Sequence, residues 1–352
     1  MAMSDIFPAE EMRKLQLTGG STYIVSLPKD WIEKMGLERG SLVSITRLDD
    51  LSLRIQPKGA ERTDRPKRAI INISDGDAPE RLVRRLVSTY LLGYNIIQIK
   101  TQQNRIDSRQ RFEVKDFTRK KLVGTEILSD LPRELTLQVL LSYAELSVKD
   151  ALRRMSVIAA SMHRDAISTL ATDDLHLARE IIAMDDEVDR FSLYIIRLLK
   201  AAVSDGLVLK EIGLQSPREC LGYRLITKSV ERMADHAVNI AQNSLALTPS
   251  TLREEVLNEL KTLSEAALGA FEEAVDSLFD RSYPKADLVI QRAEKTREME
   301  AAAIQKIIKN APLEDVAVLR LVVESILRTA EYGSDIAEMV LNMTITDEIV
   351  EA

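Results

Sequence analysis

The stretch ERMADHAVNIAQ, residues 231–242, returns one hundred residues later as EYGSDIAEMVLN, residues 331–342. Both copies carry acids at their first and fifth positions, namely Glu231, Asp235, Glu331 and Asp335. Residues i and i+4 lie on one face of an α-helix, where two like charges destabilise the helix by roughly 0.2–0.5 kcal/mol unless a cation neutralises them. Paired carboxylates suit a hard or borderline metal ion, so the repeated pair indicates a metal site.

A salt-bridged surface is the alternative explanation for these acids. Arg224 and Lys228 fall on the same helical face as Glu231. Arg328 falls on the face of Glu331. Charged helix faces are commonly solvated, but the duplication of the acidic pair favours the metal site.

The duplication extends over two sets of three helices. From residue 142 onward, apolar residues recur with the 3.6-residue period of α-helices. The expected helices span residues 144–171, 173–203 and 216–247 in the first set and 251–281, 284–310 and 313–343 in the second. We therefore expect two three-helix-bundle repeats, over residues 142–247 and 251–343, with their apolar faces inside.

When the two repeats are aligned, each gains one further candidate metal ligand from its second helix. The pattern that begins at Ala178 recurs from Ala286, an offset of 108, in the second helix of each repeat. The acids at equivalent positions there are expected to meet the third-helix acids across an interhelical groove. The predicted metal ligands are Glu231, Asp235, Glu331, Asp335, Asp186 and Glu294. The remaining acids of the run over residues 185–189 are expected to lie in a solvated turn from a loop into a helix.

A small β-rich unit is expected over residues 12–57. Short strands flank the turn at residues 18–21, Pro28 opens a short helix that Gly36 ends, and two further strands follow. So small a unit leaves most of its surface wet. Dimerisation is therefore expected.

The sequence RKLQLTGGSTYIVSLPKDWIEKMGLERGSLVSI, residues 13–45, resembles the swapped-hairpin domain of the AbrB/SpoVT family. The resemblance implies an interlaced dimer that binds double-stranded DNA through basic residues on and around its first hairpin. The residues that match this role are Arg13, Lys14, Ser21 and Lys29, which would contact backbone phosphates. A dimerisation module with little DNA affinity is the alternative, because the region holds few basic residues.

Residues 58–67 are polar and basic and contain Pro and Gly, which is typical of a linker. Beyond them, residues 68–141 indicate a small α+β unit. Its expected strands are 69–73, 94–100, 126–130 and 135–141, and its expected helices are 78–92 and 108–121. We find no glycine-rich phosphate loop there, and we expect the unit to space or dimerise the protein.

Composition and charge limit the classes of protein. The 352 residues are 45% hydrophobic and only 4% aromatic, which favours helices packed on aliphatic side chains. No apolar run approaches the length of a membrane span and no signal peptide is visible, so a cytoplasmic location without membrane insertion is expected. Residues 1–135 hold 24 Lys and Arg against 19 Asp and Glu, whereas residues 136–352 hold 24 against 36. This asymmetry fits an anionic partner for the first part and a cationic one for the second.

Third helices that carry Glu-Arg-x-x-Asp-His-x-x-Asn-Ile-Ala resemble those of the PhoU family. The first repeat keeps the pattern from Glu231 to Ala241, whereas the second has Tyr332 for the arginine and Ile336 for the histidine. The resemblance implies regulation of phosphate uptake, with iron, zinc or another divalent or trivalent metal ion at the acidic motif. An AbrB-like domain ahead of a PhoU-like module resembles the phosphate-uptake regulators common in archaea.

The expected fold is multidomain: a small β swapped-hairpin domain, a middle α+β unit and an all-α part of two repeats. Two functions follow. In the first, the chain would be a transcriptional regulator, in which a homodimer or higher oligomer binds DNA and the helical module senses metal, phosphate or a partner. Alternatively, it is an adaptor that only dimerises through its N-terminal domain and docks on a phosphate transporter or signalling kinase. An enzyme is not expected, because a carboxylate-bridged iron oxidase would show Glu-x-x-His on its helices.

Overall fold

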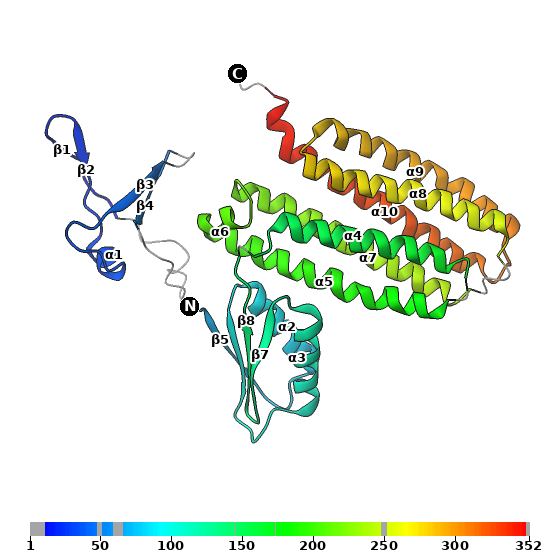
Figure 1. Cartoon of the computed structure of the whole chain (residues 1–352), viewed down its shortest axis with the longest axis horizontal. Helices are drawn as coiled ribbons and strands as arrows, with labels where there is room; N and C mark the ends of the chain where they lie inside the picture. The colour runs from blue at the N-terminus through cyan, green and yellow to red at the C-terminus, as the bar shows by residue number, and fades with distance from the viewer. Residues whose placement is uncertain are drawn as a thin grey trace. The chain divides into compact units, whose positions relative to one another are not determined.

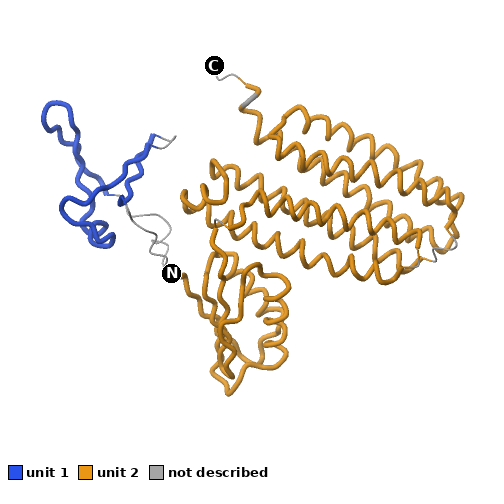
Figure 2. The backbone as a smooth tube through the Cα atoms, in the orientation of Figure 1, with its two compact units in different colours: residues 1–65 blue, residues 66–352 orange. Residues whose placement is uncertain are grey.

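The computed structural model divides the chain into two compact units, residues 1–65 and residues 66–352 (Figure 2). The structure describes residues 11–47, 51–58, 66–143, 145–172, 174–247 and 252–349. Most of the predicted linker over residues 58–67 lies outside the described residues. The boundary predicted between the two helical repeats, at residues 248–250, lies outside them as well.

The N-terminal unit consists of two β-hairpins and one short helix (Figure 1). Its elements are β1 (Gln16–Thr18), β2 (Thr22–Ile24), α1 (Lys29–Lys34), β3 (Val43–Arg47) and β4 (Leu53–Pro57). Strand β1 pairs antiparallel with β2, and β3 with β4. Gly19 and Gly20 turn the first hairpin with φ of 62° and 82°, a backbone region that favours glycine. None of the described residues of this unit is buried, so a single copy has no core of its own.

A four-stranded sheet with two helices opens the second unit. Its elements are β5 (Arg68–Ile73), α2 (Pro79–Leu91), β6 (Ile96–Thr101), α3 (Ser108–Lys121), β7 (Thr125–Leu131) and β8 (Glu134–Val139). The strand order is β5-β6-β8-β7, with β5 parallel to β6 and the other pairs antiparallel. Leu82, Leu86 and Tyr90 of α2 share one hydrophobic core with Ile97 and Leu137 of the sheet. We call residues 68–139 the α+β part.

The rest of the second unit is helical. Its helices are α4 (Val148–Thr169), α5 (Leu175–Ser204), α6 (Gly206–Glu211), α7 (Pro217–Ser244), α8 (Glu254–Asp280), α9 (Tyr283–Asn310), α10 (Val316–Thr344) and the 3-10 helix η3 (Ile345–Asp347). Helices α4, α5 and α7 pack together as the first repeat, and α8, α9 and α10 as the second. Helix α7 also packs on α10, and α4 on α8, so both repeats share one hydrophobic core. The short helix α6 lies where a loop was expected, and the side chain of Asp205 caps it by accepting from the backbone N–H of Leu207.

Helix α5 holds the α+β part against the first repeat. Leu193 of α5 packs on the α+β core. The guanidinium of Arg197, also on α5, lies 4.7 Å from the centre of the Tyr90 ring and donates to the backbone carbonyl of Tyr90. The predicted fold class, β hairpins followed by an α+β part and a helical part, is thereby confirmed. Among the described helices, none has both the length and the apolar character that crossing a membrane requires.

Candidate functional site

An acidic cluster lies between helices α5 and α7 of the first repeat. Helix α7 contributes Glu231 and Asp235, and helix α5 contributes Asp185, Asp186 and Asp189. The acids of α5 were partly expected in a solvated turn, but they lie in the middle of a helix of 30 residues. The prediction was wrong because apolar residues on both sides keep the helical period through the acidic run.

Asp185 is the most constrained carboxylate of this cluster. Its Oδ1 atom is buried and has no hydrogen-bond partner among the described residues. Burial, followed by the charges of Asp189 and Asp235, raises the pKa of Asp185 to about 6. An unpartnered buried oxygen costs free energy, and a bound cation would remove that cost.

The two acids of helix α7 have different surroundings. Lys228 places its Nζ 2.5 Å from Oε2 of Glu231, one turn away on the same helix. Asp235 keeps contact with solvent, yet partial burial and then the charge of Glu231 raise its pKa. Helix α7 therefore presents one paired carboxylate and one that is repelled by its neighbours.

A lysine from the α+β part reaches the same cluster. Lys121, the last residue of helix α3, places Nζ 2.5 Å from Oδ1 of Asp186 and 2.7 Å from Oδ2 of Asp189. Only 15% of its side chain is exposed. Burial alone would lower the pKa of Lys121, but the hydrogen bonds to both aspartates outweigh burial and raise it. Asp186, a predicted metal ligand, is thus paired with an ammonium group, whereas Asp185 is not.

Arginines surround the equivalent acids of the second repeat. Glu331 accepts from Arg297 of helix α9 at 2.5 Å and from Arg328 of helix α10 at 2.6 Å. Burial alone would raise the pKa of Glu331, but these two guanidinium groups lower it. The cavity beside them, of about 470 Å³, is also lined by Glu294, Asp335 and, from helix α7, Arg232.

The two repeats therefore differ in charge at matching positions. At the offset of 108, Asp185 corresponds to Ala293, and Asp189 corresponds to Arg297. The second repeat lacks one carboxylate of the first and carries a guanidinium in place of another. The acidic cluster of the first repeat therefore keeps an excess of negative charge. In the second repeat, Arg297 and Arg328 neutralise Glu331.

The acids of the first repeat suit a metal ion better than those of the second, because fewer of them are paired with a cation among the described residues. Asp185, Asp189 and Asp235 offer carboxylate oxygens, the ligands that hard cations prefer, and one of these oxygens is buried without a partner. Within the described parts of the chain, no three Asp, Glu, His or Cys side chains are already arranged to hold an ion. Binding in the first repeat would therefore require carboxylates to turn toward a common point.

Two histidines contact hydroxyl groups across the boundary between the repeats. His163 of α4 is fully buried, with Nε2 2.9 Å from Oγ of Ser264 on α8 and Nδ1 3.2 Å from Oγ1 of Thr329 on α10. His236 of α7 places Nδ1 3.2 Å from Oγ of Ser325 on α10. These contacts join the repeats rather than complete the acidic cluster.

The predicted DNA-contacting residues lie on the exposed N-terminal unit. Arg13 and Lys29 each pair with a nearby glutamate. Lys14 and Ser21 are exposed beside and within the first hairpin. The side chains of the four predicted residues are accessible to a ligand. Of the three cations among them, Arg13 and Lys29 already have carboxylate partners.

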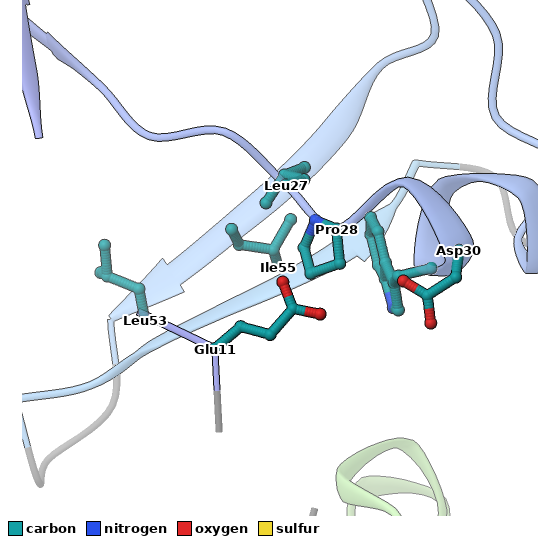
Figure 3. A pocket seen from close by; sticks show the side chains of 7 residues that line it. Glu11, Leu27, Pro28, Asp30, Leu53 and Ile55 are labelled. Carbon is teal, nitrogen blue, oxygen red and sulfur yellow. The ribbon is translucent and has the colours of Figure 1, made fainter. Parts of the chain in front are cut away.

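A hollow of about 530 Å³, lined by apolar and acidic side chains, lies on the same unit (Figure 3). It is lined by Glu11, Leu27, Pro28, Asp30, Trp31, Leu53 and Ile55. Large side chains on the strands, among them Leu17, Tyr23 and Ile45, are exposed as well. Exposed large apolar side chains gathered on so small a unit are typical of an interface.

Two parts of the chain match models of known protein families. Residues 152–244 match the family model of the PhoU domain. This part of the chain is a PhoU-like domain. Ahead of it, residues 16–63 match a model described as antidote-toxin recognition MazE, bacterial antitoxin, which is AbrB-like.

Full-length relatives extend the match beyond the PhoU domain. A Thermotoga maritima protein named phosphate-specific transport system accessory protein PhoU homolog 1 is 25% identical over 217 residues, which cover 59% of this chain and 86% of the relative. A Caulobacter vibrioides PhoU homolog of the same system is 24% identical over 197 residues, 53% of this chain and 82% of the relative. The crystal structure of PhoU from Pseudomonas aeruginosa matches 56% of this chain and 96% of its own, with a TM-score of 0.50 at 17% identity, which shows a shared fold.

Sequence reasoning missed three residues of the cluster, namely Asp185, Asp189 and Lys121. The two aspartates are four residues apart on α5 and so repeat the spacing of Glu231 and Asp235, a pattern that was visible in the sequence. Lys121 left no comparable pattern, because its contact with Asp189 joins residues 68 positions apart.

Proposed function

We propose that this chain regulates phosphate uptake by acting on partner proteins and not by catalysis. The observation that carries the proposal is the PhoU domain over residues 152–244, whose relatives are named accessory proteins of the phosphate-specific transport system. The expected partners are components of a phosphate transporter or a signalling protein. Deletion of the gene is expected to alter phosphate uptake in cells moved from high to low phosphate. Uptake that stays equal in deleted and complemented cells contradicts this role.

The metal ion belongs to the first repeat in this proposal. Its support is the excess of carboxylates there and the buried, unpartnered oxygen of Asp185. Asp185, Asp189 and Asp235 would hold the ion, and iron, zinc or another divalent or trivalent cation fits the charge. When bound, the ion would neutralise carboxylates that otherwise repel each other and so stabilise the contact between α5 and α7.

Matched variants of the two repeats test the metal site. The double variant Glu231→Gln/Asp235→Asn is expected to lose the metal of the purified protein, measured by elemental analysis. The equivalent double variant Glu331→Gln/Asp335→Asn is expected to keep it, because the acids of the second repeat already face arginines. Equal metal content in the first variant and the wild type rejects the site, and a loss only in the second variant assigns the ion to the other repeat.

The N-terminal unit dimerises and binds double-stranded DNA in this proposal. The match of residues 16–63 to an AbrB-like antitoxin model supports this role, as does the exposed apolar surface of the unit. Arg13, Lys14, Ser21 and Lys29 would contact backbone phosphates, which position a protein on DNA before bases are distinguished.

Salt dependence of duplex binding tests this role. Each lost phosphate contact reduces the slope of log affinity against log salt by about 0.9, so Arg13→Ala/Lys14→Ala is expected to reduce it by about 2. The control is Arg39→Ala, an exposed basic residue in the turn after α1, which is expected to leave the slope unchanged. A chain without residues 1–57 that binds duplex as tightly as the whole chain contradicts the DNA-binding role.

An adaptor that does not bind DNA is the second candidate function. The pairing of Arg13 and Lys29 with glutamates favours it, since a paired cation gains less from a phosphate. The adaptor would dimerise through the N-terminal unit and dock on a transporter component or a signalling kinase. Retained dimerisation without duplex binding at low salt would identify this function.

A further inference from the structure

Lys121 brings a residue of the α+β part into the acidic cluster of the first repeat. Its Nζ lies within 2.7 Å of carboxylate oxygens of both Asp186 and Asp189 on helix α5. The preceding residue, Lys120, instead pairs with Asp116 of its own helix at 2.9 Å. Among the described residues, Lys121 is thus the cation of helix α3 that forms ion pairs with α5, in addition to the packing between the two helices.

Among the described residues, the cluster has fewer paired cations than acids. Its carboxylates are Asp185, Asp186, Asp189, Glu231 and Asp235, and the ammonium groups paired with them are Lys121 and Lys228. The uncompensated negative charge attracts a further cation. A cation bound beside Asp189 would repel the ammonium of Lys121 and compete for the same oxygens.

We propose that Lys121 is a built-in competitor for the metal ion of the first repeat, so that metal binding releases the end of helix α3 from helix α5. This inference rests on the proposed metal site. The coupling is reciprocal: the factor by which the ion weakens the Lys121 contact equals the factor by which Lys121 weakens binding of the ion. The α+β part thereby responds to whether the site is occupied.

The release is local. Arg197 of α5 still contacts the ring and the backbone carbonyl of Tyr90, and Leu193 still packs on the α+β core. Neither contact involves the acidic cluster. Metal binding is therefore expected to loosen the last turn of α3 and not to detach the α+β part.

Binding of Mn²⁺ by the full chain, measured by electron paramagnetic resonance, tests the competition, because carboxylate oxygens suit this ion. Lys121→Met removes the charge and keeps an unbranched apolar stem. It is expected to bind Mn²⁺ about 5-fold to 150-fold more tightly than the wild type, the usual range of coupling between sites. Lys121→Arg keeps the charge and is expected to bind like the wild type, as is the neighbouring control Lys120→Met. Equal affinities of Lys121→Met and the wild type overturn the competition.

Hydrogen exchange of the amides in residues 118–122 tests the release without relying on affinity. In the wild type, saturation with Mn²⁺ is expected to speed exchange in this last turn of α3. In Lys121→Met, exchange is expected to be fast already and unaffected by Mn²⁺. Unchanged exchange in the saturated wild type overturns the release. If the wild type binds no Mn²⁺, the metal site and the coupling fall together, whereas Mn²⁺ binding that is indifferent to Lys121 rejects the coupling alone.

Discussion

His163 shows how one buried side chain makes stability depend on pH. Burial, with a smaller contribution from Arg164, lowers its pKa from 6.5 to about 4. Between these pH values the unfolded chain binds a proton that the folded chain does not. The contribution of His163 to stability is therefore complete above about pH 6.5 and is lost as pH falls toward 4. The expected loss is about 3 kcal/mol, measured by urea unfolding followed by circular dichroism between pH 4 and 7.

The variant His163→Gln isolates this effect, because glutamine keeps polar atoms near Ser264 and Thr329 but does not titrate. Its stability is expected to depend less on acid than that of the wild type. Asp185 acts in the opposite direction, since its pKa is raised to about 6 in the folded chain and its ionisation costs stability as pH rises from about 4 to 6. The same pH slope in wild type and His163→Gln would show that His163 is not the group responsible.

Two glycines on helices α8 and α10 provide a matched test of how closely these two helices pack. A Cβ on Gly333 of α10 would lie 3.0 Å from backbone atoms of Ala270 and Phe271 on α8. Gly333→Ala is expected to destabilise the protein by about 1–3 kcal/mol, because the backbone of α8 would have to shift by a few tenths of an ångström to admit the methyl group. A Cβ on Gly269 of α8 would meet nothing within 4 Å. Gly269→Ala is therefore expected to stabilise by about 0.5–1 kcal/mol through helix propensity.

Thermal unfolding of both variants measures the difference. A higher melting temperature for Gly269→Ala and a lower one for Gly333→Ala are expected. If both alanines stabilise, helices α8 and α10 do not approach each other as closely as the structure indicates.

The long helices were largely predictable from the sequence, but the direction in which a single side chain points from its helix was not. Long apolar periods predicted the six long helices within a few residues, because each buries one broad face. Helix α6 escaped prediction, since its six residues are too few to show a period. Asp186 was chosen over Asp185 by its match to Glu294, yet neighbouring residues of a helix point about 100° apart. Only packing of α5 on α7 and α3 determines that Asp185 faces Asp235 and Asp186 faces Lys121.

At the scale of the whole molecule, the exposed apolar side chains of the N-terminal unit predict that copies of the chain pair through this unit. Ile45 of β3 and Leu53 of β4 are 61% and 63% exposed, and no described residue of the unit is buried. A second copy that covers these side chains would bury the apolar surface that one copy leaves in water. We therefore expect a dimer, and we expect Ile45→Asp/Leu53→Asp to convert it to a monomer at micromolar concentration, measured by light scattering after gel filtration. Leu313→Asp is the control, because Leu313 is 92% exposed on the helical part and is expected to leave the mass unchanged. A wild type with the mass of one chain, or a double variant with the mass of two, would show that these hairpins do not pair the copies.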